Sequence, residues 1–254
     1  MDVQGKVAIV TGGGTGVGRA TALDLARRGC AVAVNYSRSA AEAEETAAAV
    51  LRLGVRSIAF RADVADDAAC RALVDATVQE LGRVDVLVQS AGVTSFIPHA
   101  NLDAVGAEDW QRILGVNLVG AFQMARAVKA PMDAAGAGVI VNVSSVAGIA
   151  GVGSSIPYCA SKAAMNNLTI TLARALAPRI RVVAVAPGFI TGRWLAGGLG
   201  AAYEPVKKAM EAKSPLGRVC EPEDVSAAIL SLICGSDLVT GVVVPVEGGM
   251  LIAG

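Results

Sequence analysis

Short runs of apolar residues alternate with segments of helical periodicity along most of the chain. The runs are apolar throughout, which is typical of strands buried on both faces of a sheet. We expect strands at Val7–Val10, Ala31–Tyr36, Ser57–Arg61, Val84–Gln89, Val139–Ser144, Arg181–Ala186 and Val242–Val246. Between them, apolar residues recur three and four positions apart, as in amphipathic helices. We expect helices at Gly18–Arg28, Ala40–Leu53, Asp66–Leu81, Ile156–Ala177 and Pro222–Cys234, and one or two over Asp109–Ala135.

This alternation predicts an α/β fold, with a doubly wound parallel sheet covered by helices on both faces. No linker or composition break interrupts the chain, so we expect residues 1–254 to form a single domain. The stretch Gly188–Ser214 is the only long region without a predicted strand, and it is rich in glycine. Residues 188–214 are therefore the best candidate for a mobile substrate lid.

Composition excludes several classes of protein. Apolar residues make up 54% of the chain and charged residues 17%, which excludes a disordered chain. Lys plus Arg and Asp plus Glu are both 22, so no positive field favours nucleic acid. The five cysteines are scattered and form no Cys-x-x-Cys pair, which argues against a disulfide framework or a metal site and favours a reducing cytoplasm. We predict neither a signal peptide nor a membrane span.

A glycine cluster lies between the first expected strand and the first expected helix. It reads Thr11-Gly12-Gly13-Gly14-Thr15-Gly16-Val17-Gly18. Glycines let the backbone approach a pyrophosphate, and the free N–H groups at a helix start can bind it. A flexible turn without a ligand is the alternative. The position of the cluster favours a dinucleotide site, with contacts expected from Gly12, Thr15, Gly16, Val17 and Gly18.

The end of the second expected strand bears on the choice of dinucleotide. An acidic residue there would bind the ribose 2′-hydroxyl of NAD, and a basic residue would accommodate the 2′-phosphate of NADP. The sequence is Asn35-Tyr36-Ser37-Arg38, without an acidic residue. The sequence therefore favours NADP(H), bound through Ser37 and Arg38, with NAD(H) as the alternative. Arg38 could instead be a solvated residue at a helix start.

Tyr158 and Lys162 are four residues apart within one expected helix, so their side chains share a face. A tyrosine needs its pKa lowered by about three units, or about 4 kcal/mol, to exchange protons near pH 7. An ammonium about 4 Å away contributes about that much at an effective dielectric near 20. Ser145 follows the strand Val139–Ser144 and lies 13 residues before Tyr158. It could hold a reacting oxygen beside the phenol, a role that Ser144 could share.

These motifs together resemble the short-chain dehydrogenase/reductase family over essentially the whole chain, and the C-terminal segment is similar to 3-oxoacyl reductases. The resemblance implies a Rossmann-like fold. Its dinucleotide motif matches at Thr11, Gly12, Gly16 and Gly18, its adenine contacts at Asp63 and Val64, its catalytic tetrad at Asn117, Ser145, Tyr158 and Lys162, and its nicotinamide turn at Pro187, Gly188, Ile190 and Thr191. The family's Asn-Asn-Ala-Gly segment is replaced here by Gln89-Ser90-Ala91-Gly92, of which we expect Ser90, Ala91 and Gly92 to contact the cofactor.

The resemblance implies a role for each member of the tetrad. Tyr158 would protonate the carbonyl oxygen during reduction and deprotonate the alcohol during oxidation. Lys162 would lower the pKa of Tyr158 and bind the nicotinamide ribose, and Ser145 would orient the substrate. Asn117 would hold a water that links Lys162 to solvent. NADPH would carry the hydride, because no side chain can.

The substrate is the least constrained part of the interpretation. We expect its pocket to be lined by Thr94, Phe96, Ser145, Val152, Phe189 and Trp194. This largely apolar lining suits a small-molecule ketone or secondary alcohol with an apolar body, or an acyl thioester. The alternatives are an NAD-dependent sugar, steroid or polyol dehydrogenase of the same fold, and a cofactor-binding regulator without turnover. Because family members pair helices between subunits, we also expect a homotetramer or homodimer.

Overall fold

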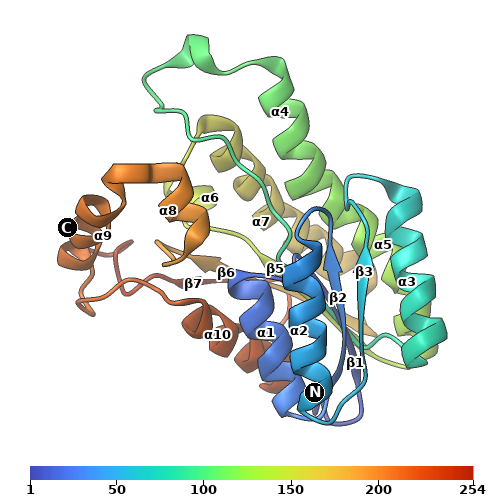
Figure 1. The fold of residues 1–254 in the computed structure, drawn as a ribbon. Coiled ribbons are helices and arrows are strands. Elements are labelled where there is room, and N and C mark those ends of the chain that lie inside the picture. Colours follow the sequence, from blue (N-terminus) through green and yellow to red (C-terminus); the bar gives the residue numbers. More distant parts are fainter. Residues whose placement is uncertain (254) are drawn as a thin grey trace.

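Seven parallel strands form the centre of the computed structural model, which describes residues 1–253 (Figure 1). Their order across the sheet is β3-β2-β1-β4-β5-β6-β7. The strands are β1 Val7–Thr11, β2 Ala31–Tyr36, β3 Ser57–Arg61, β4 Val86–Gln89, β5 Gly138–Val143, β6 Ile180–Pro187 and β7 Val243–Val246. The strand order reverses between β1 and β4, and ligands of open α/β sheets bind at such a reversal, beyond the carboxyl ends of the strands.

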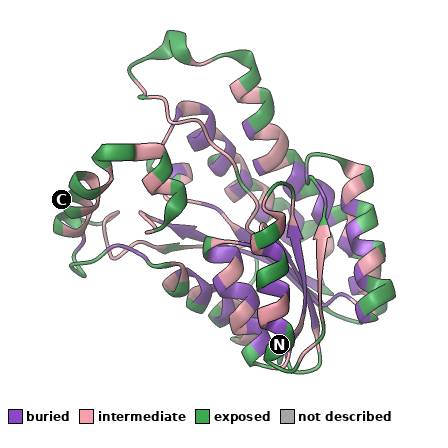
Figure 2. Ribbon diagram, in the orientation of Figure 1, coloured by how far each residue is buried: buried purple, intermediate pink, exposed green. Residues whose placement is uncertain are grey.

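Each central strand is apolar on both of its faces, as its sequence predicts. In β1, Ala8 and Val10 pack into one hydrophobic layer, whereas Val7 and Ile9 pack into the other. Alternate side chains of a strand point to opposite faces, so this strand is covered from both sides. The buried interior of the sheet is visible between its helical layers (Figure 2).

Three helices cover each face of the sheet. On one face lie α1 Gly16–Arg27, α2 Ala40–Arg52 and α10 Pro222–Cys234, which contribute Leu25, Val50 and Ile229 to the core. On the other lie α3 Asp67–Leu81, α5 Gly120–Ala134 and α7 Ile156–Leu176, which contribute Leu73, Met124 and Leu172. The predicted doubly wound sheet with helices on both faces is confirmed.

The expected helix over Asp109–Ala135 is interrupted by a wider turn. α4 covers Ala107–Leu114, a π-helical turn covers Gly115–Val119, and α5 follows. Single π turns within helices occur frequently at functional sites. This one carries Asn117, whose side chain is fully buried.

The predicted lid contains helices that the sequence analysis did not identify. After the end of β6 come α8 Arg193–Leu199, a 3₁₀ turn over Gly200–Ala202 and α9 Tyr203–Lys213. Short helical turns also occur at Leu102–Ala104 and at α6, Ala147–Ala150. In Figure 1, α8 and α9 stand at the edge of the molecule beyond the carboxyl ends of the strands, and in Figure 2 both carry exposed and intermediate residues and no buried one. Within residues 1–253, no helix combines the length and apolar character needed to cross a membrane.

Candidate active site

The glycine cluster forms a tight loop against the segment that follows β4. Gly12 has a φ of 63°, and a Cβ on it would lie 3.1 Å from the Ala91 backbone. A Cβ on Gly18 would lie 2.3 Å from the Gly12 carbonyl oxygen. The Thr11 hydroxyl accepts a hydrogen bond from the Ala91 N–H at 3.1 Å. Only glycine permits these approaches, so the loop is a narrow backbone cradle at the sheet edge.

Helix α1 begins at Gly16, directly from this cradle. Its N-cap residue, Thr15, makes no side-chain capping bond, and its first turn contains no acidic residue. The first N–H groups of a helix have no partners within the helix, and the helix dipole favours negative charge there. The cradle therefore suits an anionic group such as a pyrophosphate.

The end of β2 presents a basic side chain beside the cradle. The Asn35 carbonyl accepts a hydrogen bond from the Gly13 N–H at 3.0 Å, which connects β2 to the glycine loop. Ser37 and Arg38 follow and are exposed. Within residues 1–253, Arg38 takes part in no ion pair. Arg61 at the end of β3 donates to the Ser37 carbonyl at 3.3 Å and so supports this turn.

Gln89 braces the strand at the place where the chain departs from the family motif. Its buried amide donates to Asn142 Oδ1 at 3.1 Å and to the Ala121 carbonyl at 3.0 Å. It thereby connects β4 with β5 and α5. This role is not predicted from the sequence, although a long amide at the end of an otherwise apolar strand is a signal for it. Ser90, Ala91 and Gly92 follow and lie against the glycine loop and Asn117.

Tyr158 and Lys162 lie together at the start of α7. The Ser155 hydroxyl caps this helix by accepting from the Tyr158 N–H at 3.4 Å, which fixes the first turn that carries the phenol. Lys162 Nζ lies 5.7 Å from the centre of the Tyr158 ring and donates to the Val143 carbonyl at 2.8 Å. Both side chains are largely buried. The structure therefore places the ammonium beside the phenol, as the spacing predicts.

Burial moves the two pKa values in opposite directions. It raises the pKa of Tyr158 to about 12, partly offset by a hydrogen bond with Ser145, and it lowers the pKa of Lys162 to about 8. Desolvation disfavours the charged form of each group. The expectation that the lysine alone brings the phenol near pH 7 is therefore wrong for the protein by itself. Further positive charge beside the ring is needed to make the phenol more acidic.

Two neighbouring serines after β5 have different surroundings. The Ser144 hydroxyl is buried and donates to Asn166 Oδ1 at 2.5 Å, so it fixes β5 to α7. The Ser145 hydroxyl is only half-buried, lies beside the phenol of Tyr158, and accepts from the Ala147 N–H at 3.1 Å. Of the two, Ser145 is the one whose hydroxyl can also reach a substrate oxygen.

Asn117 connects the segment after β4 to helix α7. Its Oδ1 accepts from the Val93 N–H at 2.8 Å, and its Nδ2 donates to the Val93 carbonyl and to Ser161 Oγ, both at 3.0 Å. The Ser161 hydroxyl in turn donates to the Tyr158 carbonyl at 2.7 Å. The amide thus fixes the loop after β4 relative to Tyr158 through a fully satisfied buried network.

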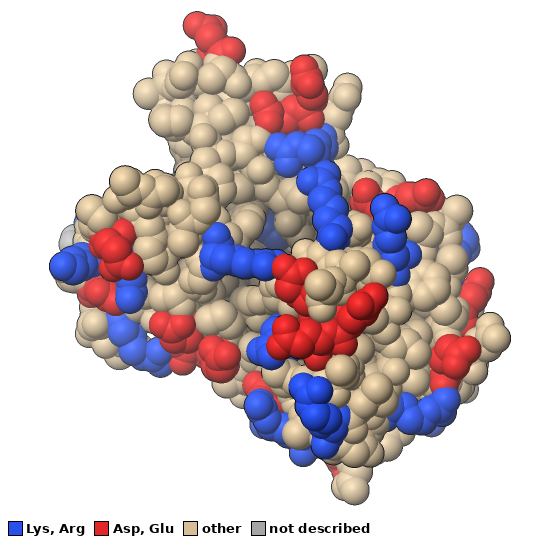
Figure 3. All heavy atoms as spheres, viewed as in Figure 1, with Lys and Arg blue, Asp and Glu red and all other residues tan. Residues whose placement is uncertain are grey.

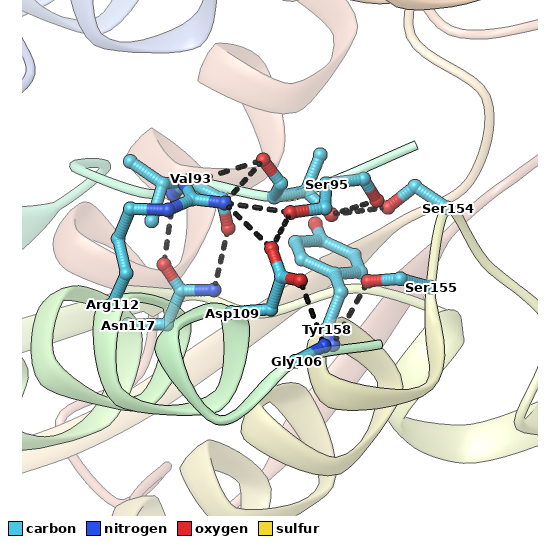
Figure 4. Close-up of polar contacts among 10 residues, drawn as sticks. Val93, Ser95, Gly106, Asp109, Arg112, Asn117, Ser154, Ser155 and Tyr158 are labelled. Carbon is cyan, nitrogen blue, oxygen red and sulfur yellow. Dashed lines mark hydrogen bonds and ion pairs between the residues drawn. The ribbon is translucent and has the colours of Figure 1, made fainter. Parts of the chain in front are cut away.

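One wall of the site is more polar than the sequence predicts. Figure 4 shows the Tyr158 side chain pointing toward the loop that carries Val93 and Ser95. The Thr94 and Ser154 hydroxyls are 2.6 Å apart, and Arg112 donates to Ser95 Oγ at 2.6 Å. Asp109 completes this network by bonding both Ser95 and Arg112. No role for Ser154, Asp109 or Arg112 is predicted from the sequence. A local signal existed for two of them, because Asp109 and Arg112 lie three residues apart within an expected helix.

Aromatic side chains from the predicted lid and from the loop after β4 meet beside the phenol. The Trp194 ring lies 6.0 Å from the Tyr158 ring and 6.1 Å from the Phe96 ring, centre to centre. Phe189 packs instead on Tyr203, at 5.7 Å. Val152 is exposed shortly before the start of α7. Trp194 thus lies against the phenol ring, and Phe96 packs on Trp194.

The turn after β6 approaches the same sheet edge. The Pro187 carbonyl accepts from the Val146 N–H at 3.0 Å, and a Cβ on Gly188 would lie 2.8 Å from the Glu247 side chain. The Ile190 side chain is half-buried and packs against the core. The Thr191 hydroxyl bonds Glu221. Asp63 and Val64 follow β3, where Asp63 accepts from the Ala65 N–H at 3.0 Å.

The structure thus brings the glycine cradle, the Tyr158–Lys162 pair, Ser145 and Asn117 to one edge of the sheet from separate segments of the chain. It does not show Phe189 or Val152 against this group, because Phe189 packs on Tyr203 and Val152 is exposed. A backbone cradle, a helix start, an exposed arginine and a buried Tyr–Lys pair fit an anionic dinucleotide beside a proton-transfer centre. Within the described chain, no cluster of three His, Cys, Asp or Glu residues could hold a metal ion.

Comparisons with known proteins agree with this arrangement. Residues 6–196 match the family model described as short chain dehydrogenase. A cis-4-hydroxycyclohexanecarboxylate dehydrogenase of Sinomonas cyclohexanicum is 39% identical over 96% of both chains. A 3-oxoacyl-(acyl-carrier-protein) reductase of Synechocystis is 37% identical over 97% of both. A crystal structure titled NAD⁺-bound xylitol dehydrogenase superposes with a TM-score of 0.88 at 32% identity, covering 98% of this chain and 100% of that one.

Proposed function

Because this chain belongs to the short-chain dehydrogenase family and is an oxidoreductase, we propose that it interconverts a ketone and a secondary alcohol with NADP(H). The observation that carries the proposal is the buried pair of Tyr158 and Lys162 beside the glycine cradle. When bound, the nicotinamide supplies the hydride and a positive ring in its oxidised form.

Residues of the cradle hold the dinucleotide in this proposal. The N–H groups at the start of α1 bind the pyrophosphate, with Gly12, Thr15, Gly16, Val17 and Gly18 around it. Ser37, Arg38, Asp63, Val64, Ser90, Ala91 and Gly92 would hold the adenosine half. Lys162, Pro187, Gly188, Ile190 and Thr191 would hold the nicotinamide half.

Tyr158 moves the proton at the reacting oxygen. Its phenol donates to the carbonyl oxygen during reduction, and the phenolate accepts the alcohol proton during oxidation. Ser145 donates a hydrogen bond to the same oxygen and holds it within reach. Lys162 stabilises the phenolate through its charge, and Asn117 keeps the loop after β4 in register with Tyr158. Trp194 covers one side of the phenol ring, and Phe96 packs on Trp194.

The preference for NADP(H) rests on Arg38. A guanidinium can bind a 2′-phosphate with several donors, and Arg38 is exposed beside the cradle. The Arg38→Ala variant should lose at least about tenfold in kcat/KM with NADPH and little with NADH, because one charge-assisted contact is removed. Arg52→Ala, at the far end of α2, is the matched control. A wild-type preference for NADH, or equal losses with both cofactors, would refute the assignment.

The substrate proposal is an amphipathic ketone or secondary alcohol, including 3-oxoacyl thioesters. The aromatic wall formed by Phe96 and Trp194 suits an apolar body. The hydroxyl wall formed by Thr94 and Ser154 favours a second candidate, oxidation of a polyol or sugar with NAD⁺. A panel of 3-oxoacyl thioesters, cyclic ketones and polyols, each assayed with both cofactors, separates the two. Highest kcat/KM for a polyol with NAD⁺ would replace the first proposal by the second.

Two further proposals concern the predicted lid and assembly. Residues 188–214 act as the substrate lid, because α8 places Trp194 over Tyr158. The chain forms a homotetramer or homodimer through α5 and α7, where Phe122 and Ile170 are exposed, with the exposed Val119 directly before α5. Apolar side chains clustered on an exposed surface favour a protein interface. Sedimentation equilibrium should show the oligomer, and a monomer at all concentrations would refute the assembly.

A further inference from the structure

An ion pair joins the predicted lid to the dinucleotide side of the cleft. Arg193, the first residue of α8, lies with its guanidinium 2.6 Å from the Glu42 carboxylate in the first turn of α2. The two residues are 151 positions apart in the chain. The molecule is hollowed between α8 and the first two helices, and Figure 3 shows a basic side chain crossing this hollow to an acidic one.

Glu42 belongs to the turn of α2 that packs on the glycine cradle. A Cβ on Gly14 would lie 2.9 Å from the Ala43 nitrogen, so this turn touches the loop backbone. The Thr46 hydroxyl donates to the Glu42 carbonyl at 2.8 Å and lies 3.3 Å from the Gly14 carbonyl. The Arg193 guanidinium therefore reaches the rim of the cradle proposed to hold the dinucleotide phosphates.

The other side of α8 faces the reaction centre. Trp194, the next residue, packs on Tyr158. Gly192, before it, has a φ of 134°, and its N–H donates to the Tyr203 hydroxyl at 3.3 Å. Adjacent residues of one short helix thus contact both the cofactor side and the substrate side of the cleft. A change of partner at Arg193 would be transmitted directly to Trp194.

The Glu42–Arg193 pair is accessible and replaceable. Both side chains are more than a third exposed, and exposed ion pairs contribute little stability. A dinucleotide phosphate can replace the carboxylate, because it accepts the same two parallel hydrogen bonds from a guanidinium. A 2′-phosphate carries more charge than a carboxylate, and a pyrophosphate brings two charged phosphoryl groups close together. We propose that Arg193 is a phosphate-binding residue: when a dinucleotide binds, one of its phosphate groups takes the guanidinium from Glu42, and α8 is held over Tyr158.

This inference rests on the proposed function, and direct binding measurements separate the two. Fluorescence titration of the full-length protein with NADPH and with NADH gives Kd without turnover. Arg193→Ala should weaken binding about tenfold, and Glu42→Gln should tighten it by about two- to fivefold. The two variants should change Kd in opposite directions, because Arg193→Ala removes the group that binds the phosphate and Glu42→Gln removes the carboxylate that competes with it. If Arg193→Ala loses affinity only for NADPH, Arg193 binds the 2′-phosphate. If it loses affinity equally for NADPH and NADH, Arg193 binds the pyrophosphate.

Matched variants control for charge and folding. Glu45→Gln removes the same charge from α2, where Glu45 pairs with Arg19, and Lys207→Ala removes a positive charge from α9. Both should leave Kd within about twofold. In the Arg193→Ala background, Glu42→Gln should no longer tighten binding, because its effect acts through the arginine. Thermal unfolding checks that each variant is folded.

Three results would overturn the inference. They are an unchanged Kd for both dinucleotides in Arg193→Ala, weaker binding in Glu42→Gln, or an undiminished effect of Glu42→Gln without the arginine. If the wild-type protein binds neither dinucleotide, the proposed function fails together with the inference.

Discussion

Removing the Asn117 amide should destabilise the protein as well as slow it. Asn117 is fully buried and makes three hydrogen bonds of 2.8, 3.0 and 3.0 Å, two with the Val93 backbone and one with Ser161. A buried polar group left without a partner costs about 1–3 kcal/mol. Because Val93 is only half-buried, water can replace part of the loss. We therefore expect Asn117→Ala to lower the free energy of unfolding by about 2–4 kcal/mol.

Urea unfolding followed by circular dichroism measures this loss, with an unchanged slope showing that the same surface is exposed. Asn167→Ala is the matched control, because Asn167 is an exposed asparagine on α7. It should change the unfolding free energy by less than about 0.5 kcal/mol. If the unfolding free energy of Asn117→Ala also stays within about 0.5 kcal/mol of wild type while activity is lost, the hydrogen bonds of Asn117 do not stabilise the fold as proposed.

Two further predictions concern proton transfer and the cradle. Because burial lowers the pKa of Lys162 to about 8 and raises that of Tyr158 to about 12, the phenol stays protonated while the ammonium loses its proton above pH 8. The rate of carbonyl reduction should therefore be constant up to about pH 8 and fall above it, because the ammonium that stabilises the phenolate is lost. The rate of alcohol oxidation should rise with pH, and it should rise less steeply above about pH 8. Lys162→Met should remove both features from the pH–rate profiles; their persistence would contradict the role of Lys162. Gly18→Ala places a Cβ 2.3 Å from the Gly12 carbonyl oxygen and should weaken NADPH binding at least about tenfold by displacing the cradle. Gly197→Ala, which has open space around it, should bind normally, and equal affinities for the two variants would refute the steric argument.

Local patterns in the sequence were sufficient to predict the layout of the sheet. Val7–Val10 and Val139–Ser144 are recognisable because buried parallel strands are apolar on both faces. The Tyr158–Lys162 spacing and the glycine cluster also depend only on local geometry. Their meeting at one edge follows from the rule that ligands bind beyond the carboxyl ends of parallel strands.

Long-range contacts account for what the sequence did not predict. Helix α8 was missed because glycines interrupt its periodicity and it packs through Trp194. The polar network of Ser95, Asp109 and Arg112 joins two segments that no local pattern connects. The raised pKa of Tyr158 was missed for a different reason, because charge was counted and the cost of burial was not.

The Tyr158→Phe variant tests the central claim most directly, because it removes one oxygen and leaves the ring packing against Trp194 in place. NADPH affinity, measured by fluorescence, and turnover of a carbonyl substrate should be determined on the same preparation. We predict an affinity within about twofold of wild type and a turnover reduced by at least about 10²-fold, the usual contribution of a positioned acid. Unchanged turnover in the phenylalanine variant would contradict proton transfer by this phenol.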